Sequence, residues 1–197
     1  MTLSRRSFLS TLLATPLAGL ATQQAFAGNP AEDYVHQLGV EVLRLAQGGN
    51  RGDKGLQRRF AGLLNRYISM SGIANFALGP YKSKLPDGDR SMFYGLVSNY
   101  AAALFVYYVD DFQGSDLKIN SSSQQGQFTV VDTSIVGKNE PLRWRVGGTP
   151  GSFRIADLNV KGIWLSLAMQ KMFRDTLNAS QGNFDPLYAK LREANTW

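Results

Sequence analysis

Residues 151–165 read GSFRIADLNVKGIWL and combine the patterns of a strand and a helix around one glycine. From Phe153 to Val160, apolar residues alternate irregularly with polar ones, which is typical of an incompletely buried strand. Gly162 marks the change to a helical period that continues to Leu177. The apolar face of the predicted helix comprises Leu165, Met169, Met172, Phe173 and Leu177, widened by Ile163, Trp164 and Leu167. This surface exceeds what a helix on a sheet usually needs, and either tight packing or a cavity would account for it.

Three helical segments are predicted before this stretch, at 31–47, 55–68 and 73–78, the last ended by Gly79-Pro80. A polar turn follows at 82–89. Residues 90–109 then form a long helix that is apolar on more than one side. Such a helix is normally buried on two faces, or it lines a cavity on one of them.

Four runs rich in branched and aromatic residues are predicted as strands, at 117–120, 126–136, 142–147 and 152–160. Their short connections imply antiparallel neighbours. Leu142, Trp144 and Val146 share one face of their strand, and Arg143 and Arg145 share the other. With a final short helix at 184–195, the order of elements predicts an α+β fold in which helices pack on one face of a curved, mostly antiparallel sheet.

Length and composition limit the class of protein. The chain has 197 residues, of which 44% are hydrophobic and 18% are charged, so it is not a disordered protein. It contains no cysteine, which excludes thiolate catalysis and zinc–cysteine sites. Its net charge is +6, and a mild positive charge favours solubility or weak attraction to anionic membrane surfaces.

The N-terminus carries an export pattern. Residues 4–9, Ser-Arg-Arg-Ser-Phe-Leu, form a twin-arginine core, and the apolar run 9–21 is too short and too interrupted to span a bilayer. Ala25-Phe26-Ala27 then gives a small-x-small cleavage pattern. The pattern predicts a twin-arginine signal peptide at 1–27, cleaved near Ala27/Gly28, and a single periplasmic domain at 28–197. The alternative is an amphipathic N-terminal helix that the protein retains.

Residues suited to catalysis or metal binding are few. His36 stands near Asp33 in a predicted helix, but the sequence has no nucleophile elbow to accompany the pair. Asp110-Asp111 lacks the histidines or the calcium-loop spacing that a metal site needs. We therefore predict no catalytic residues and no metal site, and expect that the protein is not an enzyme. A hydrolase that uses His36 is the alternative.

Two segments resemble the MlaC/toluene-tolerance auxiliary family. Residues 76–81, Phe-Ala-Leu-Gly-Pro-Tyr, are similar to its leucine-glycine-x-tyrosine segment. Residues 153–163 are similar to its tryptophan-lysine-x-x-aspartate-x-x-x-x-glycine-valine-serine segment, with Asp157 and Gly162 at the aspartate and glycine positions. Trp164 replaces the usual serine, and we expect it to narrow or reshape the mouth of a pocket.

The resemblance implies a periplasmic phospholipid-binding shuttle of the Mla ABC-transport pathway. It implies a curved sheet of the nuclear-transport-factor-2 type, a deep apolar pocket and no enzymatic activity. The implied partners are the phospholipid cargo, an outer-membrane lipoprotein complex, and an inner-membrane ABC transporter with its substrate-binding domain. No cofactor other than the lipid cargo and no nucleic acid are implied. The alternatives are a carrier of a hopanoid-type lipid and a periplasmic adaptor that binds no ligand.

We predict which residues would line such a pocket from the apolar faces of the elements above. The predicted lining comprises Leu104, Tyr108, Val130, Trp144, Ile155, Trp164, Leu165, Met169 and Phe173. Weak contacts with a lipid headgroup are assigned to Arg143, Arg145 and Lys161. Methionine suits chains of variable length because its side chain adapts its shape.

Overall fold

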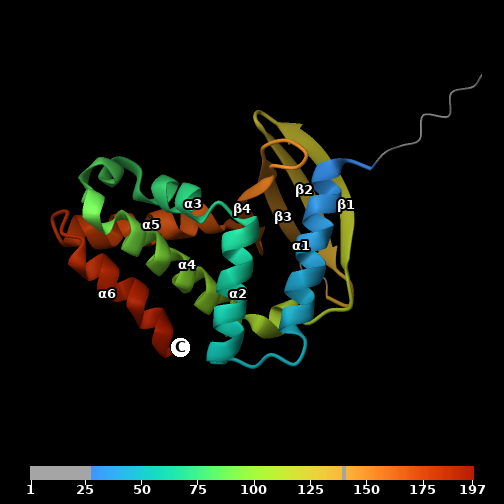
Figure 1. Ribbon diagram of the computed structural model, residues 1–197, viewed down its shortest axis with the longest axis horizontal. Coiled ribbons are helices and arrows are strands. Elements are labelled where there is room, and N and C mark those ends of the chain that lie inside the picture. Colours follow the sequence, from blue (N-terminus) through green and yellow to red (C-terminus); the bar gives the residue numbers. More distant parts are fainter. Residues whose placement is uncertain (1–27, 139–140) are drawn as a thin grey trace, which may run out of the picture.

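A computed structural model of the protein describes residues 28–138 and 141–197, except the side chain of residue 195. The predicted signal peptide at 1–27 lies outside the described residues. The elements, several of which Figure 1 labels, are α1 (Pro30–Ala46), α2 (Lys54–Tyr67), α3 (Met70–Leu78), η1 (Gly79–Lys84), η2 (Asp87–Asp89), α4 (Arg90–Tyr107), η3 (Val109–Phe112), β1 (Leu117–Gln125), β2 (Phe128–Ile135), β3 (Pro141–Gly147), β4 (Arg154–Val160), β5 (Ile163–Trp164), α5 (Leu165–Ala179), α6 (Asp185–Glu193) and η4 (Ala194–Thr196).

The strands form a five-stranded sheet in the order β1-β2-β3-β4-β5, with every neighbouring pair antiparallel. The α+β prediction is therefore confirmed. The β1 strand is longer than predicted, because it continues through residues 121–125. That half of β1 is polar and mostly exposed at the edge of the sheet, so it carries no apolar alternation for a sequence pattern to detect.

Helices cover one face of the sheet and extend beyond it. In Figure 1, α1 lies along the sheet, α3 and α5 lie beside β4 and extend away from the sheet, and α4 and α6 pack with them beyond its edge. A single buried apolar cluster joins the two parts, and it includes Leu38 from α1, Phe93 from α4 and Trp144 from β3. No helix in the described ranges is both long enough and apolar enough to cross a membrane.

The stretch after β4 differs from the prediction that a helix begins at Gly162. Lys161 and Gly162 both have positive φ, 53° and 84°. They form a two-residue hairpin turn of the kind that matches the twist of antiparallel strands. Ile163 and Trp164 then pair with β4 as the short strand β5, and α5 starts only at Leu165. Ile163 and Leu167 are largely exposed, so they do not widen the buried face of the helix.

Candidate functional site

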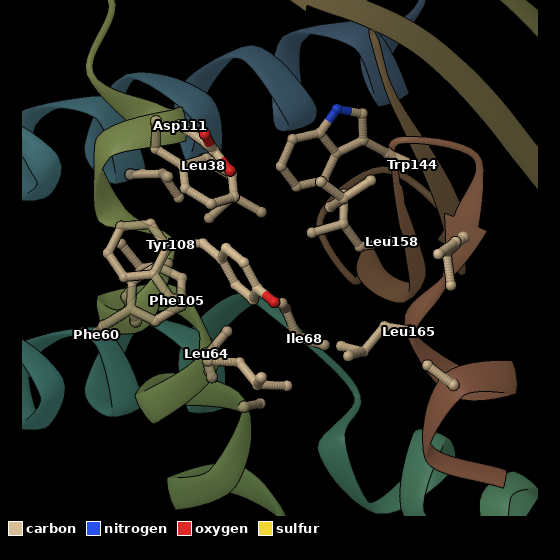
Figure 2. Close-up of a pocket in the computed structure, with 18 of the residues that line it drawn as sticks. Leu38, Phe60, Leu64, Ile68, Phe105, Tyr108, Asp111, Trp144, Leu158 and Leu165 are labelled. Atoms are coloured by element: carbon tan, nitrogen blue, oxygen red, sulfur yellow. The ribbon is translucent and has the colours of Figure 1, made fainter. Parts of the chain in front are cut away.

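A pocket of about 390 Å³ lies between the inner face of the sheet and the helices α1, α2 and α4. Figure 2 shows most of its walls. The lining residues are Leu38, Val42, Phe60, Leu63, Leu64, Ile68, Ala101, Leu104, Phe105, Tyr108, Asp111, Phe112, Trp144, Leu158, Val160, Lys161, Ile163, Leu165 and Ala168. Almost all are apolar, and the volume falls within the roughly 300–1,000 Å³ of ordinary ligand sites. The pocket therefore suits an apolar molecule.

The sheet contributes an apolar wall because its strands alternate. On β3, Trp144 faces the pocket, and its indole nitrogen donates a hydrogen bond to Thr133 Oγ1 at 2.9 Å. The Thr133 hydroxyl donates in turn to the carbonyl oxygen of Leu142 at 3.3 Å. The polar atom of the tryptophan is thus satisfied within the sheet, which leaves its ring to present carbon to the pocket.

Aromatic rings pack together on the helical side. Phe60 of α2 and Phe105 of α4 stack with ring centroids 3.6 Å apart and planes 13° apart. The Phe112 ring lies 5.0 Å from that of Phe105. Because these rings hold three elements together, the wall at this end of the pocket is well packed.

The pocket opens to solvent between η3 and the β4–β5 turn. Two lining residues there are strongly exposed, Tyr108 by 48% and Ile163 by 63%. Figure 2 shows the Tyr108 ring projecting into the pocket toward Ile68. The Lys161 Nζ and Asp111 Oδ2 atoms lie 3.1 Å apart and link the β4–β5 turn to η3. These four residues define the mouth of the pocket.

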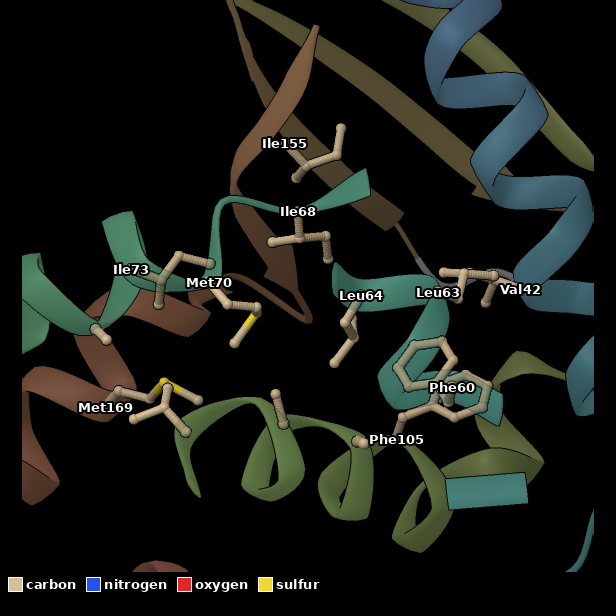
Figure 3. Close-up of a cluster of buried hydrophobic side chains, with 14 of the residues drawn as sticks. Val42, Phe60, Leu63, Leu64, Ile68, Met70, Ile73, Phe105, Ile155 and Met169 are labelled. Atoms are coloured by element: carbon tan, nitrogen blue, oxygen red, sulfur yellow. The ribbon is translucent and has the colours of Figure 1, made fainter. Parts of the chain in front are cut away.

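The structure brings some of the predicted lining residues together and places others elsewhere. Leu104, Tyr108, Trp144, Leu165 and the predicted headgroup residue Lys161 all line the pocket. Ile155, Met169 and Phe173 do not, because each is buried in the neighbouring core. Figure 3 shows Ile155 next to Ile68, with which it forms a parallel bridge. Phe173 packs edge-on against Phe93, with centroids 5.7 Å apart.

Val130 and Trp164 lie on the other face of the sheet. Val130 pairs with Arg145, and Trp164 pairs with Asn159 across β4 and β5. Since side chains alternate between the faces of a strand, both point away from the pocket that Trp144 lines. The Trp164 ring lies 4.2 Å from the guanidinium carbon of Arg145. Trp164 does not line the pocket, so the expectation that it narrows or reshapes the pocket mouth does not agree with the structure.

The two predicted headgroup arginines are also on that outer face. Arg143 forms an ion pair with Asp132, and Arg145 forms one with Asp157 at 3.4 Å between Nη1 and Oδ2. They are separated from the pocket by the sheet itself. Alternation along β3 places Arg143 and Arg145 on the face opposite to Trp144. Because Trp144 is predicted to line the pocket, this alternation does not agree with the prediction that the two arginines contact a lipid headgroup.

Asp157, at the family's aspartate position, has a structural role. Only 2% of its side chain is exposed. Its Oδ1 accepts a hydrogen bond from the Ser166 backbone nitrogen at 3.0 Å, and its Oδ2 accepts one from the Ser166 hydroxyl at 2.5 Å. Since Ser166 lies in the first turn of α5, Asp157 caps that helix from the adjacent strand.

The sequence reasoning missed the contribution of α1 and α2 to the pocket. Leu38, Val42, Phe60, Leu63 and Leu64 all line it. These residues recur at helical spacing within the predicted helices 31–47 and 55–68, but an amphipathic stripe has the same pattern whether it meets another side chain or a cavity. The positions opposite these stripes depend on contacts between segments distant in the chain.

Among the residues that the structure describes, those lining the pocket do not form a catalytic group. His36 lies 3.4 Å from Asp116, measured between Nε2 and Oδ1, and its side chain is exposed outside the pocket lining. Among the described residues, no three His, Cys, Asp or Glu side chains are arranged to hold a metal ion. The geometry of the site is that of a container for an apolar molecule.

Comparisons with known proteins agree with this geometry. The model of the family "MlaC protein" matches residues 38–193. A solved structure of a phospholipid-binding protein from Ralstonia solanacearum, in complex with a phospholipid, has a TM-score of 0.68 and 16% sequence identity. The match covers 85% of this chain and 95% of that one, and at this identity it shows a shared fold. Among curated proteins, none matches this chain. The family match covers most of the sequence, and the protein therefore belongs to the MlaC family.

Proposed function

We propose that this protein is a carrier that binds a phospholipid by burying acyl chain in its apolar pocket. The pocket itself is the observation that carries the proposal, because its lining is almost entirely apolar and part of it is exposed to solvent. Its family and the phospholipid complex of its structural neighbour support the same ligand class. The proposed role is binding rather than catalysis.

The energetics explain why such a carrier is needed. Exposing an acyl chain to water costs about 0.8 kcal/mol per CH₂, or on the order of 12 kcal/mol for a chain of about 16 carbons. A lipid therefore cannot diffuse freely between membranes. The volume of about 390 Å³ suits one chain, whereas two such chains need a pocket near or above the upper end of the ordinary range of roughly 300–1,000 Å³. We infer that one chain enters the pocket in the conformation described here.

We further propose that the carrier works in the periplasm, where it moves lipid between the outer and inner membranes as the soluble component of an ABC-transport pathway. Its proposed partners are an outer-membrane lipoprotein complex and an inner-membrane ABC transporter with its substrate-binding domain. Membership of the MlaC family supports this role. A ligand-free adaptor would have closed apolar faces, and the pocket argues against that alternative.

The test is to purify the exported protein, extract it with solvent and measure the bound lipid by mass spectrometry. We expect stoichiometric phospholipid. Leu104→Trp fills the pocket and should reduce bound lipid by at least about tenfold, since the lost burial amounts to several CH₂ groups. Leu167→Trp is the matched control, because Leu167 is exposed on α5 and does not line the pocket. If the wild-type protein carries no lipid and cannot be loaded with any, the proposal fails.

A further inference from the structure

An ion pair between Lys161 and Asp111 lies at the mouth of the pocket. Within the described part of the chain, the charged side chains of the pocket lining are Asp111 and Lys161. They are 50 residues apart in sequence, and their charged atoms lie 3.1 Å apart. Lys161 is 48% exposed and Asp111 is 36% exposed, so both remain accessible from solvent. A ligand whose polar group stays at the exposed side of the pocket can therefore reach this pair.

Lys161 occupies an unusual backbone position. It has a φ of 53°, in the left-handed region that two-residue hairpin turns usually fill with asparagine, aspartate or glycine. Side chains held in such conformations cluster at functional sites. Here the turn directs the lysine ammonium to the mouth of the pocket, where it meets η3.

The neighbouring acid, Asp110, is engaged elsewhere. Its Oδ2 atom accepts a hydrogen bond from Arg51 Nε at 3.2 Å, and its backbone oxygen accepts one from Lys138 Nζ at 3.1 Å. Asp110 does not line the pocket. Asp111 is thus the carboxylate that faces an incoming ligand, and its charge would repel an anionic headgroup.

We propose that Lys161 binds the phosphate of the cargo lipid, and that Asp111 holds the same ammonium when the pocket is empty. This inference rests on the proposed function, because an acyl chain in the pocket leaves its headgroup at the mouth. A lysine is a compact point charge suited to a phosphate group. Loading then exchanges one anionic partner of Lys161 for another, and the two anions compete.

Because the two anions compete for Lys161, removing the charge of Lys161 and removing the charge of Asp111 should have opposite effects on phospholipid affinity. A purely structural ion pair would not behave in this way. We would measure the binding of dimyristoylphosphatidylglycerol and of dimyristoylglycerol, which has the same chains without a phosphate. Lys161→Gln should weaken binding of the phospholipid about fivefold, the upper range for an exposed ion pair, and leave diacylglycerol binding unchanged. Asp111→Asn should strengthen phospholipid binding. Lys161→Arg, which keeps the positive charge, should bind phospholipid more tightly than Lys161→Gln does.

The matched controls come from an ion pair on α5. Lys171 Nζ and Asp175 Oδ2 lie 2.7 Å apart on the surface, outside the pocket lining. Lys171→Gln and Asp175→Asn should leave the binding of both lipids unchanged. Thermal unfolding of every variant shows whether it is folded before its affinity is compared.

Several outcomes would overturn the inference. One such outcome is that Lys161→Gln and Asp111→Asn weaken phospholipid binding equally. Another is that Lys161→Gln weakens the binding of phospholipid and of diacylglycerol to the same extent. In either case the ion pair only stabilises the structure of the mouth, and the proposal of lipid carriage is unaffected. Competition by millimolar inorganic phosphate would indicate a site for free anions instead. If the wild-type protein binds neither lipid, the proposed function itself fails, and the inference falls with it.

Discussion

Gly39 determines how closely α1 approaches the sheet. A Cβ atom at this position would lie 2.3 Å from Leu117 Cδ2, which is closer than carbon atoms can approach, and 3.0 Å from Leu117 Cβ, which is a very tight contact. The absence of a side chain therefore lets the helix lie against β1. The preceding residue, Leu38, lines the pocket, so this contact also places part of the pocket wall.

We predict that Gly39→Ala destabilises the protein. Overpacking costs about 1–3 kcal/mol, while better helix propensity returns about 0.5–1 kcal/mol. Gly62→Ala is the matched control, because Gly62 lies in α2 with no atom near the added Cβ, and it should be stabilising. Urea unfolding of both variants measures the difference. Equal stabilisation by the two substitutions would show that α1 can move away from β1 without cost.

At the scale of elements, the link between β4 and α5 depends on Asp157. The residue that precedes α5, Trp164, makes no side-chain cap. Asp157 accepts the hydrogen bonds from Ser166 instead, and Arg145 lies beside its carboxylate. This arrangement holds the first turn of α5 against the sheet, where Leu165 and Ala168 contribute to the pocket.

Asp157→Ala should therefore lower the free energy of unfolding by about 2–3 kcal/mol, because it removes a buried carboxylate that satisfies two donors. Bound lipid should fall as well, since the start of α5 loses its position. Asp175→Ala on the same helix breaks only exposed ion pairs, with Lys171 and Arg174, and should cost less than about 1 kcal/mol. Thermal or urea unfolding compares the two, and similar losses would contradict the capping role.

At the scale of the whole molecule, several tyrosines spread over the fold have a raised pKa. Burial is the main cause for Tyr34, Tyr100 and Tyr188, and the hydrogen bond to Glu41 is the main cause for Tyr67. For Tyr188, its hydrogen bond to Asp89 adds to the effect of burial. All four phenols thus hold their protons more tightly in the folded protein than in the unfolded chain.

We therefore predict alkaline destabilisation. A raised folded-state pKa gives stability that is fully present below the ordinary tyrosine pKa of 10.0 and is lost as the pH rises beyond it. The urea concentration at the midpoint of unfolding should be lower at about pH 11 than at about pH 9. Tyr188→Phe should make this difference smaller, because it removes one of the phenols with a raised pKa. An unfolding midpoint that does not change over this range would contradict the prediction.

Much of the fold could be predicted because periodicity reports which side of an element is buried. The helical period located α1, α2, α4 and α5 to within a few residues, and alternation put Trp144 opposite Arg143 and Arg145. Short or polar elements escaped this reasoning. The outer half of β1 has no apolar alternation. The β5 strand is two residues long, and its apolar residues also fit the pattern of the following helix.

By itself, the sequence determined the order of elements, the α+β class and the apolar face of β3, because these depend on local propensity and on the spacing of side chains. Only the tertiary structure decided where apolar faces leave a cavity instead of closing on each other. In the structure, Trp164 lies on the outer face of the sheet, and Asp111 forms an ion pair with Lys161 at the pocket mouth. Such contacts join distant segments, and periodicity specifies which way a residue faces but not what lies opposite it.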